Sequence, residues 1–251
     1  SLPPTLCLPG IVRTGQDFET LQPVRQRVVT IDYPGRGASG RSADVQRYGP
    51  EACLRDVMDI AAALHIHHAI VIGTSFGGLL AMGLTAARPG LVRAVVLNDI
   101  GPDVGRAGGD FVRRFVGDDP ALPDRDACVA FLREQLPPLS LATDAAWQRM
   151  AELTYQPGAD GRWHPLWDTR IATLLDGPVP NLWTLFGALA QVPVLLLWGE
   201  QSNILERATV ERMQHVHPNL KLVPVPAVGH APTMSEPEVV AALHNFLVAH
   251  G

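Results

Sequence analysis

Short runs of consecutive apolar residues alternate along the chain with segments in which apolar residues recur at helical spacing. Runs that are apolar at successive positions are typical of parallel strands covered by helices on both faces. We predict strands at residues 5–8, 27–32, 69–72, 94–98, 193–198 and 220–225, and helices at 51–64, 76–88 and 238–248. This alternation indicates an α/β fold with a doubly wound, mostly parallel sheet.

The stretch between the strand ending near Asn98 and the strand starting near Pro193 departs from this alternation. It is rich in Pro, Asp and Trp, and helical spacing recurs only in short pieces at 111–116, 126–136, 144–153 and 183–190. A segment of this length is too long for a simple loop. We therefore predict a core of residues 1–100 and 193–251. Residues 101–192 are predicted to form a helical cap over the carboxyl ends of the strands, where open α/β sheets bind ligands.

A Gly-Thr-Ser-Phe-Gly pentapeptide at 73–77 joins the third predicted strand to the helix that follows it. A serine on a sharp strand-to-helix turn stands clear of the sheet at a helix N-terminus, where negative charge is favoured. The glycines two residues to either side leave room for the turn to pack. This context predicts that Ser75 is a nucleophile.

His230 is the histidine best placed to serve Ser75 as a base. It lies in Val-Gly-His-Ala-Pro at 228–232, directly after the last predicted strand, and therefore at the same carboxyl edge of the sheet as the serine. Its place after the serine in the chain also fits a Ser-acid-His order. The histidines at 65–68 are interpreted as a solvated helix end, and His164 as either a pocket residue or a packing residue.

Four landmarks carry a resemblance to a known family: Leu-Pro-Gly at 8–10, Asp-Tyr-Pro-Gly-Arg-Gly-Ala-Ser at 32–39, the pentapeptide at 73–77, and Gly-His at 229–230. In these landmarks the chain resembles the α/β-hydrolase superfamily of esterases, epoxide hydrolases and haloalkane dehalogenases, with proline in place of the family's histidine in the first. Epoxide hydrolases and dehalogenases of this superfamily carry aspartate at the elbow, so the serine implies acyl transfer. The family begins with a two-stranded hairpin, whereas only residues 1–4 precede the first predicted strand here.

The oxyanion hole follows from the same resemblance. One donor is expected to be the backbone N–H of Phe76, directly after the nucleophile, and the other the N–H of Ile11, after the Pro-Gly turn. Losing one such donor typically costs about 3–4 kcal/mol of transition-state stabilisation. The segment at 32–39 is interpreted as a structural turn that shapes the edge of the sheet.

The acid of the triad has two candidate positions. Many family members place it after the strand that follows the cap, where this chain has Asn203, and an amide cannot offset the charge that His230 gains during catalysis. Other members place it after the strand that follows the elbow, where this chain has Asp99. We predict Asp99 as the acid, with Asn203 as a neutral alternative and Glu200 or Glu206 as further rivals.

The composition limits the partners of the protein. The net charge of −5 and the lack of any basic run argue against nucleic acid. Cys7, Cys53 and Cys128 are too scattered for a disulfide framework or a zinc site. No apolar stretch is long enough to span a bilayer and no signal peptide is visible, so the default expectation is a cytoplasmic protein without a membrane partner.

Together these features predict a serine hydrolase that cleaves a small carboxylic ester or a related acyl compound through an acyl-enzyme on Ser75, without a metal or organic cofactor. Carbon–carbon bond hydrolases, lactonases and thioesterases share this layout and stay open, as does a non-catalytic receptor for a small ligand. Trp163, Trp167 and Trp183 are candidates for an apolar substrate pocket or for the cap's own core. The substrate and the oligomeric state stay undetermined at this level.

Overall fold

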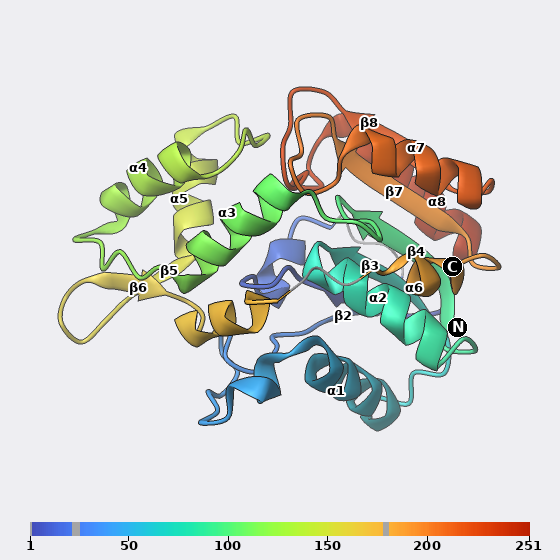
Figure 1. Ribbon diagram of the computed structural model, residues 1–251, viewed down its shortest axis with the longest axis horizontal. Helices are drawn as coiled ribbons and strands as arrows, with labels where there is room; N and C mark the ends of the chain where they lie inside the picture. The colour runs from blue at the N-terminus through green and yellow to red at the C-terminus, as the bar shows by residue number, and fades with distance from the viewer. Residues whose placement is uncertain (1, 22–25, 178–180) are drawn as a thin grey trace.

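A single parallel sheet runs through the protein. The computed structural model describes residues 2–21, 26–177 and 181–251, and in these residues six parallel strands form one sheet (Figure 1). Their order is β2 (Val28–Thr30), β1 (Thr5–Leu8), β3 (Ala69–Thr74), β4 (Val92–Asn98), β7 (Val194–Gly199) and β8 (Lys221–Val225). Each predicted strand is present, β2 as a short, half-exposed edge strand. The prediction of an α/β fold with a mostly parallel sheet is confirmed.

Helices cover both faces of the sheet. Successive strand residues point to opposite sides, so that Val71 and Leu97 join one apolar cluster while Ile72 and Val96 join another. The first cluster packs against α1 (Pro50–Ala63), α2 (Phe76–Ala87), α6 (Trp183–Gly187) and α7 (Arg207–Val216), and the second against η1 (Gly15–Phe18) and α8 (Pro237–His250). Burial on both faces explains why the central strands are apolar at successive positions.

Residues 101–192 are here called the insert. Its residues 106–175 stand beside the sheet on the left of Figure 1, whereas α6 packs against α2. The insert contains α3 (Arg106–Gly117), α4 (Arg125–Gln135), α5 (Asp144–Glu152), β5 (Tyr155–Pro157), β6 (Trp163–Pro165), η3 (Thr169–Leu175) and α6, while residues 178–180 lie outside the described residues. Side chains of Asp124 and Thr143 cap α4 and α5 by accepting hydrogen bonds from backbone N–H groups. The antiparallel β5–β6 pair was not predicted, because each strand is three residues long and ends in proline.

The sheet brings the loops after β1, β3, β4, β7 and β8 to one edge, because parallel strands end on the same side. These loops carry Ile11, Ser75, Asp99, Ser202 and His230 respectively. Another segment, η2 (Val45–Tyr48), precedes α1 and joins the turn at 32–39 to that helix. Among the described residues, no helix is both long and apolar enough to cross a membrane.

Candidate active site

Ser75 lies on a strained turn between β3 and α2. Its backbone has φ 52° and ψ −117°, a region that non-glycine residues rarely adopt and that costs of order 1–3 kcal/mol. The N–H of Ser75 donates to the carbonyl of Asn98 at 3.0 Å, which ties the turn to β4. Only glycine fits at Gly77, since a Cβ there would lie 1.9 Å from the carbonyl oxygen of Leu8. The local sequence therefore builds the sharp elbow expected for a nucleophile.

Asp99 and His230 form a buried pair behind the elbow. The Nδ1 of His230 lies 2.7 Å from Oδ2 of Asp99, and the carboxylate side chain is completely buried while the imidazole is 15% exposed. Asp99 follows β4 directly and also has a positive φ, of 54°, which turns its side chain toward the histidine loop. Its Oδ1 accepts a hydrogen bond from the N–H of Gly199 at 2.9 Å. A carboxylate held in this way can fix the histidine tautomer and stabilise its charged form.

The loop after β7 contributes a residue that sequence reasoning missed. Ser202 donates its hydroxyl to Oδ2 of Asp99 at 2.5 Å, and its Oγ accepts from the N–H groups of Ile204 and Leu205. Asn203, the neutral alternative at the neighbouring position, has an exposed side chain, and the histidine pairs with Asp99 instead. This loop thus supports an acid that comes from another strand. Ser202 and Asn203 are adjacent in the same polar loop, so nothing in the sequence indicates that Ser202 and not Asn203 faces the site.

The two backbone amides expected to form the oxyanion hole lie near the serine. The carbonyl of Gly10 accepts from the N–H of Arg13 at 3.1 Å, which closes a turn beside Ser75. A Cβ built on Gly10 would be 3.9 Å from the Cβ of Ser75. Among the described residues, neither the N–H of Ile11 nor that of Phe76 has an acceptor. Both amides are therefore available to a ligand.

A cavity of about 400 Å³ opens over these groups. Ser75 and His230 line it together with Ile11 and Asn98. Most of the apolar side chains in its wall come from the insert, among them Phe111, Phe115, Leu132, Leu136, Met150 and Leu153. Within the described residues no hydrogen bond joins Ser75 to His230, a bond that in empty sites often forms only when substrate is present.

The polar part of the lining contains two ion pairs. Arg13 forms a two-pronged pair with Asp17, and Arg149 forms one with Glu19. Arg13 also donates to the hydroxyl of Thr154 at 2.7 Å. The turn that carries Ile11 is thereby joined to the insert.

Comparison with known proteins agrees with this geometry. A model of the alpha/beta hydrolase family matches residues 6–243. The chain belongs to the alpha/beta hydrolase family. A 3-hydroxybutyrate-oligomer hydrolase from Cupriavidus necator is 31% identical, over 96% of this chain and 87% of that protein. A 2-(acetamidomethylene)succinate hydrolase from Mesorhizobium japonicum is 29% identical over 96% of this chain and 86% of its own length.

Solved structures point the same way. An α/β hydrolase from Novosphingobium aromaticivorans is 37% identical, with a TM-score of 0.92, over 99% of this chain and 90% of that one. The structure of E-2-(acetamidomethylene)succinate hydrolase is 27% identical, with a TM-score of 0.83, over 99% and 92% of the two chains. These relatives place the protein among hydrolases.

The three tryptophans proposed for the substrate pocket lie elsewhere in this hydrolase. Among the described residues that line the cavity, none is a tryptophan. Trp167 is buried in the apolar core of the insert and donates from its indole to the carbonyl of Val116 at 2.8 Å. Trp163 pairs by its backbone with Leu122, and Trp183 donates to Asp103. The packing alternative thus fits Trp163 and Trp167, which lie in the insert's own core, whereas Trp183 packs against the apolar cluster of the sheet.

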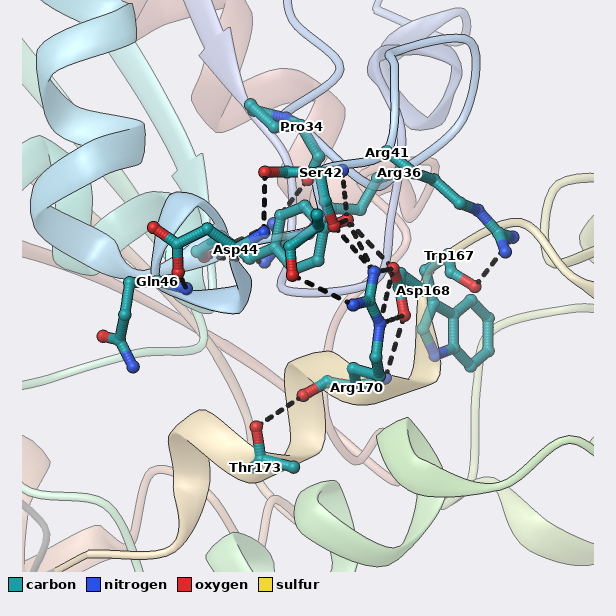
Figure 2. Close-up of polar contacts among 12 residues, drawn as sticks. Pro34, Arg36, Arg41, Ser42, Asp44, Gln46, Trp167, Asp168, Arg170 and Thr173 are labelled. Carbon is teal, nitrogen blue, oxygen red and sulfur yellow. Dashed lines mark hydrogen bonds and ion pairs between the residues drawn. The ribbon is translucent and has the colours of Figure 1, made fainter.

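The turn at 32–39 meets the insert. The N–H of Gly37 donates to the carbonyl of Leu166 at 2.7 Å, and the N–H of Asp168 donates to the carbonyl of Gly35 at 2.8 Å. Figure 2 shows the side chain of Arg170 reaching from η3 to Asp168 and to the backbone of Ser42. The turn therefore has a structural role, as the sequence predicted, and part of that role is to dock the insert.

Proposed function

We propose that the protein is a serine esterase that works through an acyl-enzyme on Ser75. The observation that carries the proposal is the 2.7 Å hydrogen bond between the buried Asp99 and His230, whose ring lines the same cavity as Ser75 on its strained elbow. A nucleophile, a base and an orienting acid on the loops of three separate strands are the parts that acyl transfer requires.

Each group has a definite task. Because Asp99 accepts a hydrogen bond from the Nδ1–H of His230, the proton stays on Nδ1 and Nε2 is free to accept the proton of Ser75 as its Oγ attacks the ester carbonyl. The N–H groups of Ile11 and Phe76 bind the resulting oxyanion. Nε2–H then protonates the departing alkoxide, which leaves an acyl-enzyme and an alcohol. Water attacks the acyl-enzyme, gives its proton to Nε2, and releases the carboxylic acid when Ser75 regains that proton.

The cavity supports an ester with an apolar acyl portion of modest size. Its volume of about 400 Å³ and its wall of leucine, phenylalanine and methionine side chains suit a short or medium aliphatic chain. The Cupriavidus necator relative is a hydrolase of 3-hydroxybutyrate oligomers, which are short aliphatic esters. We include such oligoesters in the proposed substrate class.

The test is hydrolysis of p-nitrophenyl esters of increasing acyl length, and of 3-hydroxybutyrate dimers and trimers, by the wild type and by Ser75→Ala. We expect hydrolysis by the wild type and a loss of at least about 10³-fold in Ser75→Ala. Ser140→Ala, in the insert and outside the cavity lining, is the matched control and should keep full activity. Wild-type protein that binds a fluorophosphonate at Ser75 but hydrolyses no ester would refute the ester specificity and keep the nucleophile.

A further inference from the structure

Arg36 is a buried cation without a buried anion. The residue is 1% exposed, and among the described residues no carboxylate lies within ion-pair distance of its guanidinium. Its N–H groups donate to backbone carbonyls of Ile11 at 2.8 Å, Pro34 at 2.8 Å and Tyr48 at 3.3 Å. Burial lowers the pKa of Arg36 from its ordinary value. Burying a charge costs free energy, and here no ionic partner among the described residues offsets that cost. Stability of the fold alone therefore does not explain why an arginine occupies this position.

Arg36 contacts both segments that supply the oxyanion hole. Its Nε donates to the carbonyl of Ile11, and its guanidinium carbon lies 5.7 Å from the ring centroid of Phe76. Tyr33, three residues earlier on the same turn, contacts the same two segments. Its hydroxyl donates to the carbonyl of Pro9 at 3.3 Å, and its ring meets that of Phe76 edge-on with centroids 5.5 Å apart.

These contacts constrain the peptide groups around Ile11. The carbonyl of Gly10 is held by the N–H of Arg13, and in a trans peptide the N–H of Ile11 points the opposite way. The next carbonyl, that of Ile11 itself, is held by Arg36. The peptide units on both sides of the Ile11 Cα are therefore anchored. An oxyanion donor gains its effect from being preorganised, so anchoring of this kind bears directly on transition-state binding.

We propose that Arg36 and Tyr33 are positioning residues that hold the amides of Ile11 and Phe76 at the spacing needed for one oxyanion. The proposal rests on the proposed function, since it assigns the turn at 32–39 a part in the same acyl transfer. Arginine suits this place better than lysine, because a planar guanidinium donates to several carbonyls while stacking on aromatic rings.

The experiment compares Arg36→Gln, Arg36→Lys and Tyr33→Phe with the wild type. Four quantities are measured: kcat and KM for the best p-nitrophenyl ester, the inhibition constant of a boronic acid that forms a tetrahedral adduct on Ser75, and that of the matching ether, which has no carbonyl. Melting temperatures show which variants are folded. Arg170→Gln is the control, because Arg170 belongs to the neighbouring polar cluster but, within the described residues, forms no hydrogen bond with Ile11 or Phe76.

We expect Arg36→Gln to lower kcat by about 10- to 100-fold, less than the roughly 10²–10³-fold loss when a donor itself is removed. The boronic acid should bind more weakly by the same factor, while KM and ether binding change less than about threefold, since only transition-state binding is affected. Arg36→Lys and Tyr33→Phe should lower kcat and boronic acid affinity by smaller factors, again with little change in KM or ether affinity. These two variants provide the test if Arg36→Gln does not fold. Arg170→Gln should leave the ratio of boronic acid to ether affinity unchanged.

Three results would overturn the proposal. One is a folded Arg36→Gln with wild-type kcat and boronic acid affinity. Another is a variant in which ether and boronic acid lose affinity equally, which would mean a general distortion of the cavity. A wild type that neither hydrolyses esters nor binds the boronic acid at Ser75 would overturn the proposed function first, and this inference with it.

Discussion

Replacing Asp99 with asparagine exchanges one carboxylate oxygen of a fully buried side chain for an NH₂ group, and so tests whether Asp99 is the acid of the triad. The Oδ1 position accepts from the N–H of Gly199, so the amide oxygen of the variant must occupy it. The NH₂ group then takes the Oδ2 position and faces Nδ1 of His230. A donor there requires Nδ1 to be unprotonated, which puts the ring proton on Nε2. In that tautomer the histidine cannot accept the proton of Ser75.

The size of the effect follows from this tautomer. In the reverse orientation, the NH₂ group of the amide would face the N–H of Gly199, and two donors cannot form a hydrogen bond. A flip of the amide therefore does not restore an acceptor for His230. The corresponding substitution in serine proteases lowers kcat by about 10⁴, equivalent to roughly 5.5 kcal/mol of activation free energy. We expect about 10³- to 10⁴-fold for Asp99→Asn, with KM nearly unchanged. The assay is steady-state hydrolysis of the best ester, with the melting temperature of each protein measured alongside.

Asp103→Asn is the matched control, because Asp103 lies in the same loop, is half-exposed and is not among the described residues that line the cavity. It should keep wild-type kcat. The reasoning is refuted if Asp99→Asn keeps more than about a tenth of the activity, a loss far below that of a wrong tautomer. A rise of about a thousandfold in Asn203→Asp would also refute it, since it would show that the loop after β7 supplies the acid.

Three further predictions concern the surroundings of the site. Ser202→Ala removes a donor to the acid and an acceptor for two backbone N–H groups, so urea unfolding should show a loss of about 1–3 kcal/mol, and kcat should fall about tenfold. Gly77→Ala should lose about 3 kcal/mol of stability or fail to fold, because its Cβ would overlap a β1 carbonyl, whereas Gly109→Ala in open space on α3 should gain about 0.5–1 kcal/mol. The hydrogen bond from Arg170 holds the pKa of Asp168 at about 2, so the pair stabilises the fold above the unfolded pKa of about 3.9 and loses this as pH falls toward 2. The unfolding free energies of wild type and Asp168→Asn should therefore differ by about 2 kcal/mol near neutrality and converge in acid.

Features that depend on local pattern were predictable from the sequence. The strands that are buried on both faces are continuous apolar runs, and the elbow has its glycines where close packing against β1 leaves no room for a Cβ. Asp99 could be proposed because some members of the family that the chain resembles place the acid after the strand that follows the elbow, and a parallel sheet brings the carboxyl ends of its strands to one edge. The strands and the elbow need only a few consecutive residues, whereas the acid also needed the resemblance.

Features that depend on contacts between distant segments were not predictable. Ser202 and Asn203 are neighbours in a polar loop, and only the packing of that loop against the end of β4 decides that Ser202 faces the acid. The tryptophans of the insert share the composition of a substrate pocket, yet Trp167 fills the insert's core while smaller leucines line the cavity. Apolar composition cannot distinguish a residue that packs from one that binds, because both are buried in the same way.

The turn at 32–39 connects two parts of the molecule that sequence reasoning treated separately. Its backbone pairs with the insert through Gly37 and Gly35, and the insert supplies most of the apolar side chains that line the cavity over Ser75. Its side chains at Tyr33 and Arg36 reach the two segments that carry the oxyanion amides. A shift of the insert on binding a substrate would therefore be transmitted through eight consecutive residues to the groups that stabilise the transition state. On this geometry, a substrate that packs poorly against the insert would disturb the oxyanion amides that Tyr33 and Arg36 hold in place, so acyl-chain preference should appear in kcat as well as in KM.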